Sequence, residues 1–255
     1  MQRSSSLIGT HARSDGMSPN PVSFLDHLRS EGYNSRSNKH SNSLAQAIVH
    51  DLVKYCPGMQ QKAQAGELVY DLNFTLRVGT ADWNVDLVLG PPELGATPPE
   101  PGEAICRKKP STVQVAVEIK SVMTEHHKAV KNRKRDLEAH HEHVHNYGAE
   151  AIAAGVLIVN AAPIFQSSLR SKPTTHKDPR RLVEHCLAEL RAVATRGGST
   201  GQGLDARCAV VVVHDNIDAK KTRFLTGPPA PQVGDPLNYD AFVQAICAHY
   251  TKRFA

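Results

Sequence analysis

The chain has 255 residues, of which 40% are hydrophobic, so it can bury one sizeable core. Thirty basic and 25 acidic residues give a formal net charge of +5, which suits a polyanionic partner without requiring one. The five cysteines are widely spaced and form no C-x-x-C pair, which argues against a zinc knuckle or a disulfide framework and favours a reducing compartment.

The N-terminal segment carries no structural pattern. Residues 1–20 are rich in serine and glycine and predict a flexible arm, so we expect residues 21–255 to form a single domain. The segment lacks the apolar core of a signal peptide, and no apolar run approaches about 18 residues. We therefore expect a cytoplasmic protein without a membrane partner.

Two helices are predicted before the first strand. Residues 22–31 form a short amphipathic pattern, followed by a polar linker over 31–43 in which Arg36 and Lys39 are candidate nucleic-acid contacts. A second helix is expected over 44–56, with Ser43 as its N-cap and Pro57-Gly58 as its stop signal.

A hairpin is predicted next, from alternating strands over 67–79 and 83–90. It carries three aspartates. Asp71 lies on the polar face and Asp82 in the turn, whereas Asp86 is embedded in an apolar run. A buried carboxylate needs a cation or hydrogen bonds, so Asp86 is the preferred candidate for a functional site.

The strand over 112–121 follows a proline-rich loop at 91–111 and has a charged end. Strict alternation puts four apolar side chains on one face and places Glu118 and Lys120 on the other. If this strand pairs with the strand that carries Asp86, the three charged groups converge at one edge. Two carboxylates can hold a hard divalent cation, and an ammonium group beside them can orient an attacking water. The pattern therefore predicts hydrolysis of a phosphodiester.

An acidic residue at the end of one strand, then Glu-x-Lys at the end of the next, then a basic helix resembles the PD-(D/E)XK nucleases, especially the restriction endonucleases. Asp86, Glu118 and Lys120 match the motif, while Val85 stands where the family often has proline. The resemblance covers residues 44–160 at most. It implies a restriction-endonuclease-like core, Mg²⁺ bound by Asp86 and Glu118, and activation of water with the help of Lys120.

A basic helix is predicted over 124–147, with Thr124 as its cap and Gly148 at its end. An apolar stripe on this helix should face inward. It consists of Val130, Leu137 and Val144. An adjacent face should carry three basic residues that bind nucleic acid, namely Lys128, Lys131 and Arg135. The alternative is a solvated helix whose acidic residues Asp136, Glu138 and Glu142 neutralise these charges within the helix.

The same helix is rich in histidine. His141 and His145 have the i, i+4 spacing of metal ligands on a helix. Residues 141–145 read H-E-H-V-H and so have the H-E-x-x-H form. Hydrogen bonding to phosphate or adventitious metal binding is the favoured interpretation of these histidines.

The remaining segments predict an α/β extension over 161–255. A buried strand at 154–160 precedes a basic loop in which Arg170 and Lys172 are candidate nucleic-acid contacts. A helix, a strand and a terminal helix follow, at 180–194, 207–214 and 237–253. The expected fold is α/β with α+β character, in which helices flank a central mixed sheet.

These patterns lead to one main expectation and two alternatives. The main expectation is a Mg²⁺-dependent endonuclease that cuts double-stranded DNA as a homodimeric type II restriction endonuclease. One alternative keeps the same core but acts as a repair nickase, a junction resolvase or an RNA-directed nuclease. The other is a non-catalytic protein that binds nucleic acid or metal and whose carboxylates are structural.

Overall fold

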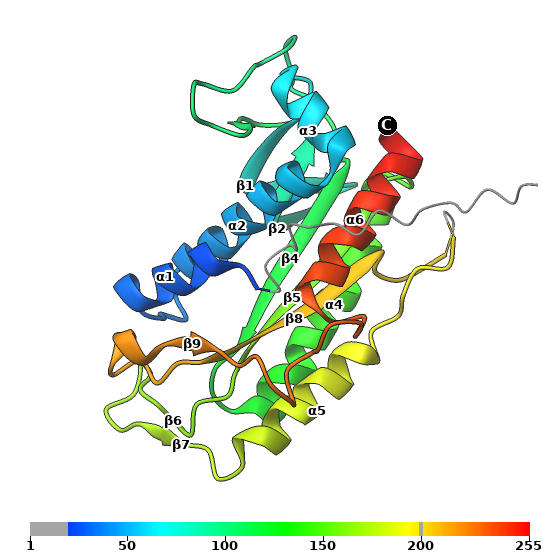
Figure 1. The fold of residues 1–255 in the computed structure, drawn as a ribbon. Coiled ribbons are helices and arrows are strands. Elements are labelled where there is room, and N and C mark those ends of the chain that lie inside the picture. The colour runs from blue at the N-terminus through cyan, green and yellow to red at the C-terminus, as the bar shows by residue number, and fades with distance from the viewer. Residues whose placement is uncertain (1–19, 199–200) are drawn as a thin grey trace, which may run out of the picture.

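The computed structural model of the chain describes residues 20–198 and 201–255 (Figure 1). The arm expected over 1–20 therefore lies, apart from Asn20, outside the described residues. The described chain forms a seven-stranded mixed sheet covered by helices, and this confirms the predicted α/β architecture. A separate two-stranded ribbon, made of β6 (Ile164–Phe165) and β7 (Thr174–Thr175), lies in the predicted basic loop.

The order of strands in the sheet is β3-β1-β2-β4-β5-β8-β9. β1 and β2 form an antiparallel hairpin, β2 is antiparallel to β4, and β4, β5 and β8 run parallel. The strands are β1 (Val69–Val78), β2 (Ala81–Gly90), β3 (Cys106–Arg107), β4 (Val115–Val122), β5 (Ile152–Asn160), β8 (Ala206–Val213) and β9 (Arg223–Phe224). The parallel strands end at one edge of the sheet, which is where ligand sites of open α/β sheets are found.

Helices cover both faces of the sheet (Figure 1). One layer contains α1 (Val22–Glu31), α2 (Lys39–Tyr55), α3 (Pro57–Gln64) and α6 (Tyr239–Phe254). The opposite layer contains α4 (His126–Tyr147) and α5 (Pro179–Arg191). A short 3₁₀ helix, η1 (Ala219–Lys221), precedes β9. None of the helices within the described ranges is long and apolar enough to cross a membrane.

The alternation of β4 sorts its side chains between the two layers, as its sequence predicts. Val115, Val117 and Ile119 pack toward α2 and α6, whereas Ala116 and Val122 pack toward α4 and α5. The predicted inward stripe of α4 is also confirmed, because its three apolar residues are fully buried in the second layer.

The predicted start of the second helix is wrong. α2 begins at Lys39, so Ser43 lies inside the helix and does not cap it. The polar residues just before it already form the turn that starts the helix, since the Asn34 and Ser37 side chains accept hydrogen bonds from the amides two residues further on. α3 then follows immediately, because Pro57 is tolerated at the first helical position.

The predicted cap of the fourth helix is also wrong. Thr124 is not its N-cap; α4 begins at His126, and Glu125 occupies the N-cap position with a left-handed backbone (φ 42°) and no capping side-chain bond. The carboxylate of Glu125 instead pairs with Arg170 at 2.6 Å. This pair ties the loop between β6 and β7 to the start of α4.

Asp205 forms a buried ionic cluster at the N-terminal ends of the parallel strands. Its carboxylate accepts from Arg253 at 2.5 Å, from His145 at 3.4 Å and from the amide of Ala153 at 2.9 Å, and Arg196 lies 3.8 Å away. Burial alone would raise the pKa of Asp205, but the hydrogen bonds from His145 and Arg253 hold it well below its usual range. The cluster therefore joins α4, α6, β5 and β8 through one ionised group.

We expect Asp205→Ala to lower the free energy of unfolding by about 3–5 kcal/mol at pH 7, because it removes the carboxylate that neutralises the buried side chain of Arg253. The folded state holds the pKa of Asp205 below its unfolded value of about 3.9, so this stabilisation is present above pH ~4 and is lost as the pH falls below it. Urea unfolding at pH 7 and at pH ~3 measures the difference. A gap between variant and wild type that does not shrink in acid would contradict this account.

Candidate active site

β2 and β4 separate where the sequence places its charged residues. Their pairing ends at Leu87 and Val117, one residue before Asp86 and Glu118 would pair. The Oδ2 atom of Asp86 then accepts a hydrogen bond of 2.8 Å from the amide of Ile119. The carboxylate thus occupies the place that a backbone carbonyl of β2 would otherwise take, and it satisfies the first unpaired amide of the fork between the strands.

The hairpin twists at the same position. Leu72 and Leu87 are paired and pack toward α2, whereas Phe74 and Val85, the pair two residues further on, pack toward α4. Between them, Asn73 has a left-handed backbone (φ 54°) opposite Asp86. The strict alternation predicted for these two strands is therefore wrong beyond this point. The twist brings the outer half of the hairpin over α4.

Asp86 is nearly enclosed by these elements. Burial raises its pKa, while the hydrogen bond from Ile119, the charge of Lys120 and the nearby hydroxyl of Ser41 of α2 oppose the rise. The carboxylate is therefore held between α2 on one side and β4 on the other.

Glu118 lies deeper than Asp86 and is only 2% exposed. Its Oε1 atom pairs with the Lys120 ammonium group, whereas its buried Oε2 atom has no hydrogen-bond partner in the described part of the chain. Burial raises the pKa of Glu118 to about 7; Lys120 opposes this shift, and the charges of Asp86 and Asp136 add to it. A carboxylate in this setting is stabilised by a further positive charge.

Lys120 marks the open end of the site. Its side chain is 23% exposed, while that of Glu118 is 3% exposed. The next residue, Ser121, shares a hydrogen bond of 2.7 Å with the hydroxyl of Tyr33 in the loop between α1 and α2. The site therefore lies at the C-terminal edge of β4, between that loop and α4.

The face of α4 that turns toward Glu118 was not predicted. It carries Arg133, Asp136 and His140 at i, i+3 and i+7. Arg133 pairs with Asp136 at 2.9 Å, and its charge lowers the pKa of the Tyr33 phenol against the larger effect of burial. His140 is completely buried, with Nδ1 4.0 Å from Oε2 of Glu118. The helical spacing of these polar residues beside the apolar stripe was the signal that could have revealed them.

The predicted basic face of α4 points elsewhere. Lys128, Lys131 and Arg135 are exposed and share one face, as expected. Successive residues of a helix are rotated by about 100°, so Arg135 lies about 200° around the axis from Arg133. The structure thus brings Asp86, Glu118 and Lys120 together, and it places the three basic residues on the outer side of α4.

The other predicted nucleic-acid contacts are side chains at the surface of the protein. Arg36 and Lys172 are exposed. Lys39 pairs with Glu31 at 3.0 Å, and Arg170 pairs with Glu125. Both of these pairs are exposed and contribute little stability, so either cation can exchange its partner for a phosphate.

The rival aspartates have structural partners of their own. Asp71 accepts from the amide of Leu72 and pairs with Arg107 at 3.4 Å. Asp82 was predicted to be a structural residue of the turn. It lies in β2 instead, opposite Arg77, with which it pairs at 3.1 Å. These contacts place both carboxylates away from the fork.

The histidines of α4 have several different surroundings. His126 contacts the carbonyl of Asn160 at 2.8 Å, His140 faces Glu118, and His145 contacts Asp205. His141 stands next to His145, with 6.1 Å between the ring centroids. The histidines of α4 thus contact residues at both ends of the parallel strands.

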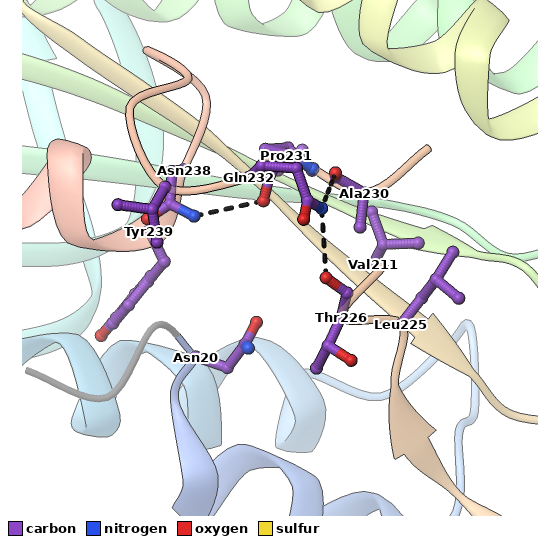
Figure 2. Close-up of a pocket in the computed structure, with 11 residues that line it drawn as sticks. Asn20, Val211, Leu225, Thr226, Ala230, Pro231, Gln232, Asn238 and Tyr239 are labelled. Carbon is purple, nitrogen blue, oxygen red and sulfur yellow. Dashed lines mark hydrogen bonds between the residues drawn. The ribbon is translucent and has the colours of Figure 1, made fainter. Parts of the chain in front are cut away.

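A small cavity lies apart from these residues, between the loop that precedes α6 and the middle of β8 (Figure 2). Its volume is about 110 Å³, well below the several hundred Å³ of a typical ligand site. The amide of Gln232 donates to the carbonyls of Thr226 and Ala230, and that of Asn238 donates to Pro231, as Figure 2 shows. No charged side chain lines the cavity, and the polar amides in its wall are already bonded.

The residues at the fork suit a magnesium ion. No group of three or more His, Cys, Asp and Glu side chains among residues 20–198 and 201–255 is arranged to enclose a metal. Mg²⁺ does not need such a cage, because it keeps several waters and is commonly held by one or two carboxylates together with substrate phosphate. Asp86 and the unpartnered Oε2 atom of Glu118 provide that donor set.

We expect Asp86→Ala to be less stable than Asp86→Asn by about 1–3 kcal/mol, because alanine leaves the buried amide of Ile119 unpaired whereas asparagine still offers an acceptor. Denaturant unfolding of both variants tests this. Equal midpoints would mean that the side chain of Asp86 does not hold the fork.

No family model matches the chain, and no similar protein was found among the curated proteins or the solved structures.

Proposed function

We propose that this protein is a Mg²⁺-dependent endonuclease that hydrolyses phosphodiester bonds of double-stranded DNA, in the manner of a type II restriction endonuclease. One observation carries the proposal: Asp86, Glu118 and Lys120 meet where β2 and β4 separate, and an oxygen of Glu118 is buried there without a partner. This arrangement agrees with the resemblance of the motif to the PD-(D/E)XK nucleases.

The side chains divide the chemical tasks by depth. Asp86 and Glu118 would hold the cation, and bound Mg²⁺ lowers the pKa of a coordinated water and neutralises charge on the phosphate. Lys120, nearest the opening, positions the attacking water while its contact with Oε1 of Glu118 keeps its ammonium group in place. Glu118 thereby links the cation to the residue that orients the nucleophile.

The geometry favours this reading over a structural role for the carboxylates. A structural carboxylate is normally paired on both oxygens or exposed to water, as Asp205 illustrates at the other end of the sheet. Glu118 is buried and paired on one oxygen only. Such an uncompensated group lowers stability, and natural proteins retain this kind of cost mainly at functional sites.

We expect Asp86→Asn and Glu118→Gln to abolish Mg²⁺-dependent cleavage of DNA, and Lys120→Met to slow it by a factor on the order of 10² or more. Binding of the same DNA in Ca²⁺, which accepts looser geometry, should persist in all three variants. Plasmid and genomic digests measure cleavage, and discrete fragments would indicate a sequence-specific enzyme.

Asp82→Asn is the matched control, since it removes a carboxylate from the same strand at a site paired with Arg77. It should cleave like the wild type. A folded Glu118→Gln protein that still cuts at the wild-type rate would remove the fork from the mechanism.

We propose that Arg133 is the basic residue of α4 that contacts the substrate. It lies on the α4 face that carries Asp136 and His140, and the carboxylate of Asp136 holds one edge of its guanidinium group. Its side chain is 40% exposed, so its remaining donors can reach a phosphate. Lys128, Lys131 and Arg135 would touch only DNA that extends along the outer side of α4.

A pair of variants separates these two surfaces. Arg133→Gln and Arg135→Gln each remove one charge from the same helix, so their long-range electrostatic effects are matched. We expect Arg133→Gln to lower both the affinity for DNA and the cleavage rate, and to flatten the salt dependence of binding by about one charge equivalent. Arg135→Gln should leave cleavage unchanged. Equal effects of the two variants would contradict the assignment of Arg133 to the site.

The proposal also concerns assembly and place of action. Cutting both strands of a palindromic site is most simply done by two active sites related by a two-fold axis, so the proposed enzyme acts as a homodimer. The proposed place of action is the cytoplasm.

A further inference from the structure

His140 is the buried residue that contacts the proposed cation ligand from behind. It lies on α4 in the middle of the face that turns toward β4 and is 0% exposed. Its Nε2 atom is 3.3 Å from the carbonyl oxygen of Ala116, and its Nδ1 atom is 4.0 Å from Oε2 of Glu118. The ring thus spans two alternate residues of one strand.

The contact with Ala116 fixes which nitrogen carries the hydrogen. A carbonyl oxygen can only accept, so Nε2 must donate to it, and the lone pair of Nδ1 then faces Glu118. Neither Nδ1 nor Oε2 has a hydrogen-bond partner within the described ranges of the chain. When Glu118 is ionised, as a cation ligand must be, two acceptors therefore face each other across 4.0 Å.

This arrangement has a consequence for the carboxylate. A donor at this position, such as a lysine or an arginine, would compete with a cation for Oε2. An acceptor edge does not compete. Oε1 of Glu118 pairs with Lys120, and repulsion between Nδ1 and Oε2 opposes any rotation that would bring the carboxylate closer to α4. The ring also fills the space behind Glu118, which prevents the side chain from rotating out of the fork.

We infer that His140 is a positioning residue, which holds the Glu118 carboxylate in the orientation that binds the divalent cation. This inference rests on the proposed function and goes beyond it, because it assigns a residue outside the Asp86, Glu118 and Lys120 set. Partners that orient a metal ligand typically affect metal affinity by a factor of 10–100 when they are removed.

The test uses three variants of the full chain and Mn²⁺ as the probe, titrated alone by calorimetry. His140→Leu removes both nitrogens but keeps an apolar side chain in the buried space, so the protein should be at least as stable as the wild type. His140→Gln can still donate to the carbonyl of Ala116. His143→Leu is the matched control, because His143 lies on the same helix but stacks on Trp83, with 4.4 Å between the ring centroids.

We expect His140→Leu to bind Mn²⁺ about 10–100-fold more weakly than the wild type and to lose cleavage in the same proportion at limiting Mn²⁺. His140→Gln should recover most of the affinity, and His143→Leu should keep it. Replacing a purely structural residue would lower the stability of the protein, whereas His140→Leu should lower the affinity for Mn²⁺ without lowering stability.

Two results would overturn the inference, and they can be told apart. If the wild type binds Mn²⁺ and cleaves DNA but His140→Leu does so equally well, only the role of His140 fails. If the wild type neither binds Mn²⁺ nor cleaves DNA, the proposed function fails and the inference falls with it. Should His140→Leu not fold, wild-type Mn²⁺ affinity in His140→Ala would also overturn the inference, because alanine removes both contacts.

Discussion

The hydrogen bond between Asp86 and the amide of Ile119 is the constraint on which the candidate site depends. A side chain of β2 replaces a backbone acceptor, so the two strands can separate without leaving a buried amide unpaired. The separation creates the fork in which Glu118 and Lys120 stand. A feature of local hydrogen bonding thus decides whether the three charged groups can meet.

The two ends of the parallel strands have opposite electrostatic characters. At the N-terminal ends, Asp205 is surrounded by arginines and a histidine that favour its ionised form. At the C-terminal end of β4, burial and neighbouring carboxylates disfavour the ionised form of Glu118. One end therefore contributes to the stability of the domain, and the other holds a buried carboxylate that is paired on one oxygen only. This contrast locates the site more clearly than any cavity does.

α4 connects the two ends, and each of its faces has a separate role. Its apolar stripe packs on the sheet, its polar face with Arg133, Asp136 and His140 borders the fork, and its outer face is basic and exposed. His145, near its C-terminus, reaches Asp205. A change in the position of this helix would therefore affect the ionic cluster and the candidate site together.

The sequence by itself determined the features that depend on short-range periodicity. Alternation identified β4 as a strand and located Glu118 and Lys120 within it, and the apolar stripe of α4 was read from helical spacing. The mixed sheet followed from the order of these elements. Asp86 was selected because a carboxylate within an apolar run needs a compensating partner, and its bond to Ile119 is one.

Only the tertiary structure decided the features that depend on pairing between distant segments. The side chains of β1 and β2 change the face of the sheet to which they point at Asn73 and Asp86. This change requires a left-handed residue in β1 at the position where β2 separates from β4, and a strictly alternating sequence pattern does not predict it. The same holds for the starts of two helices. α2 begins at the turn that contains Ser37, before Ser43, and Glu125 at the start of α4 pairs with Arg170 of a distant loop. Helical spacing in the sequence predicts which residues of α4 share its polar face. Which face borders Glu118 depends on how the helix is rotated against the sheet. That rotation is set by the burial of the apolar stripe of α4 among residues that are distant in the chain.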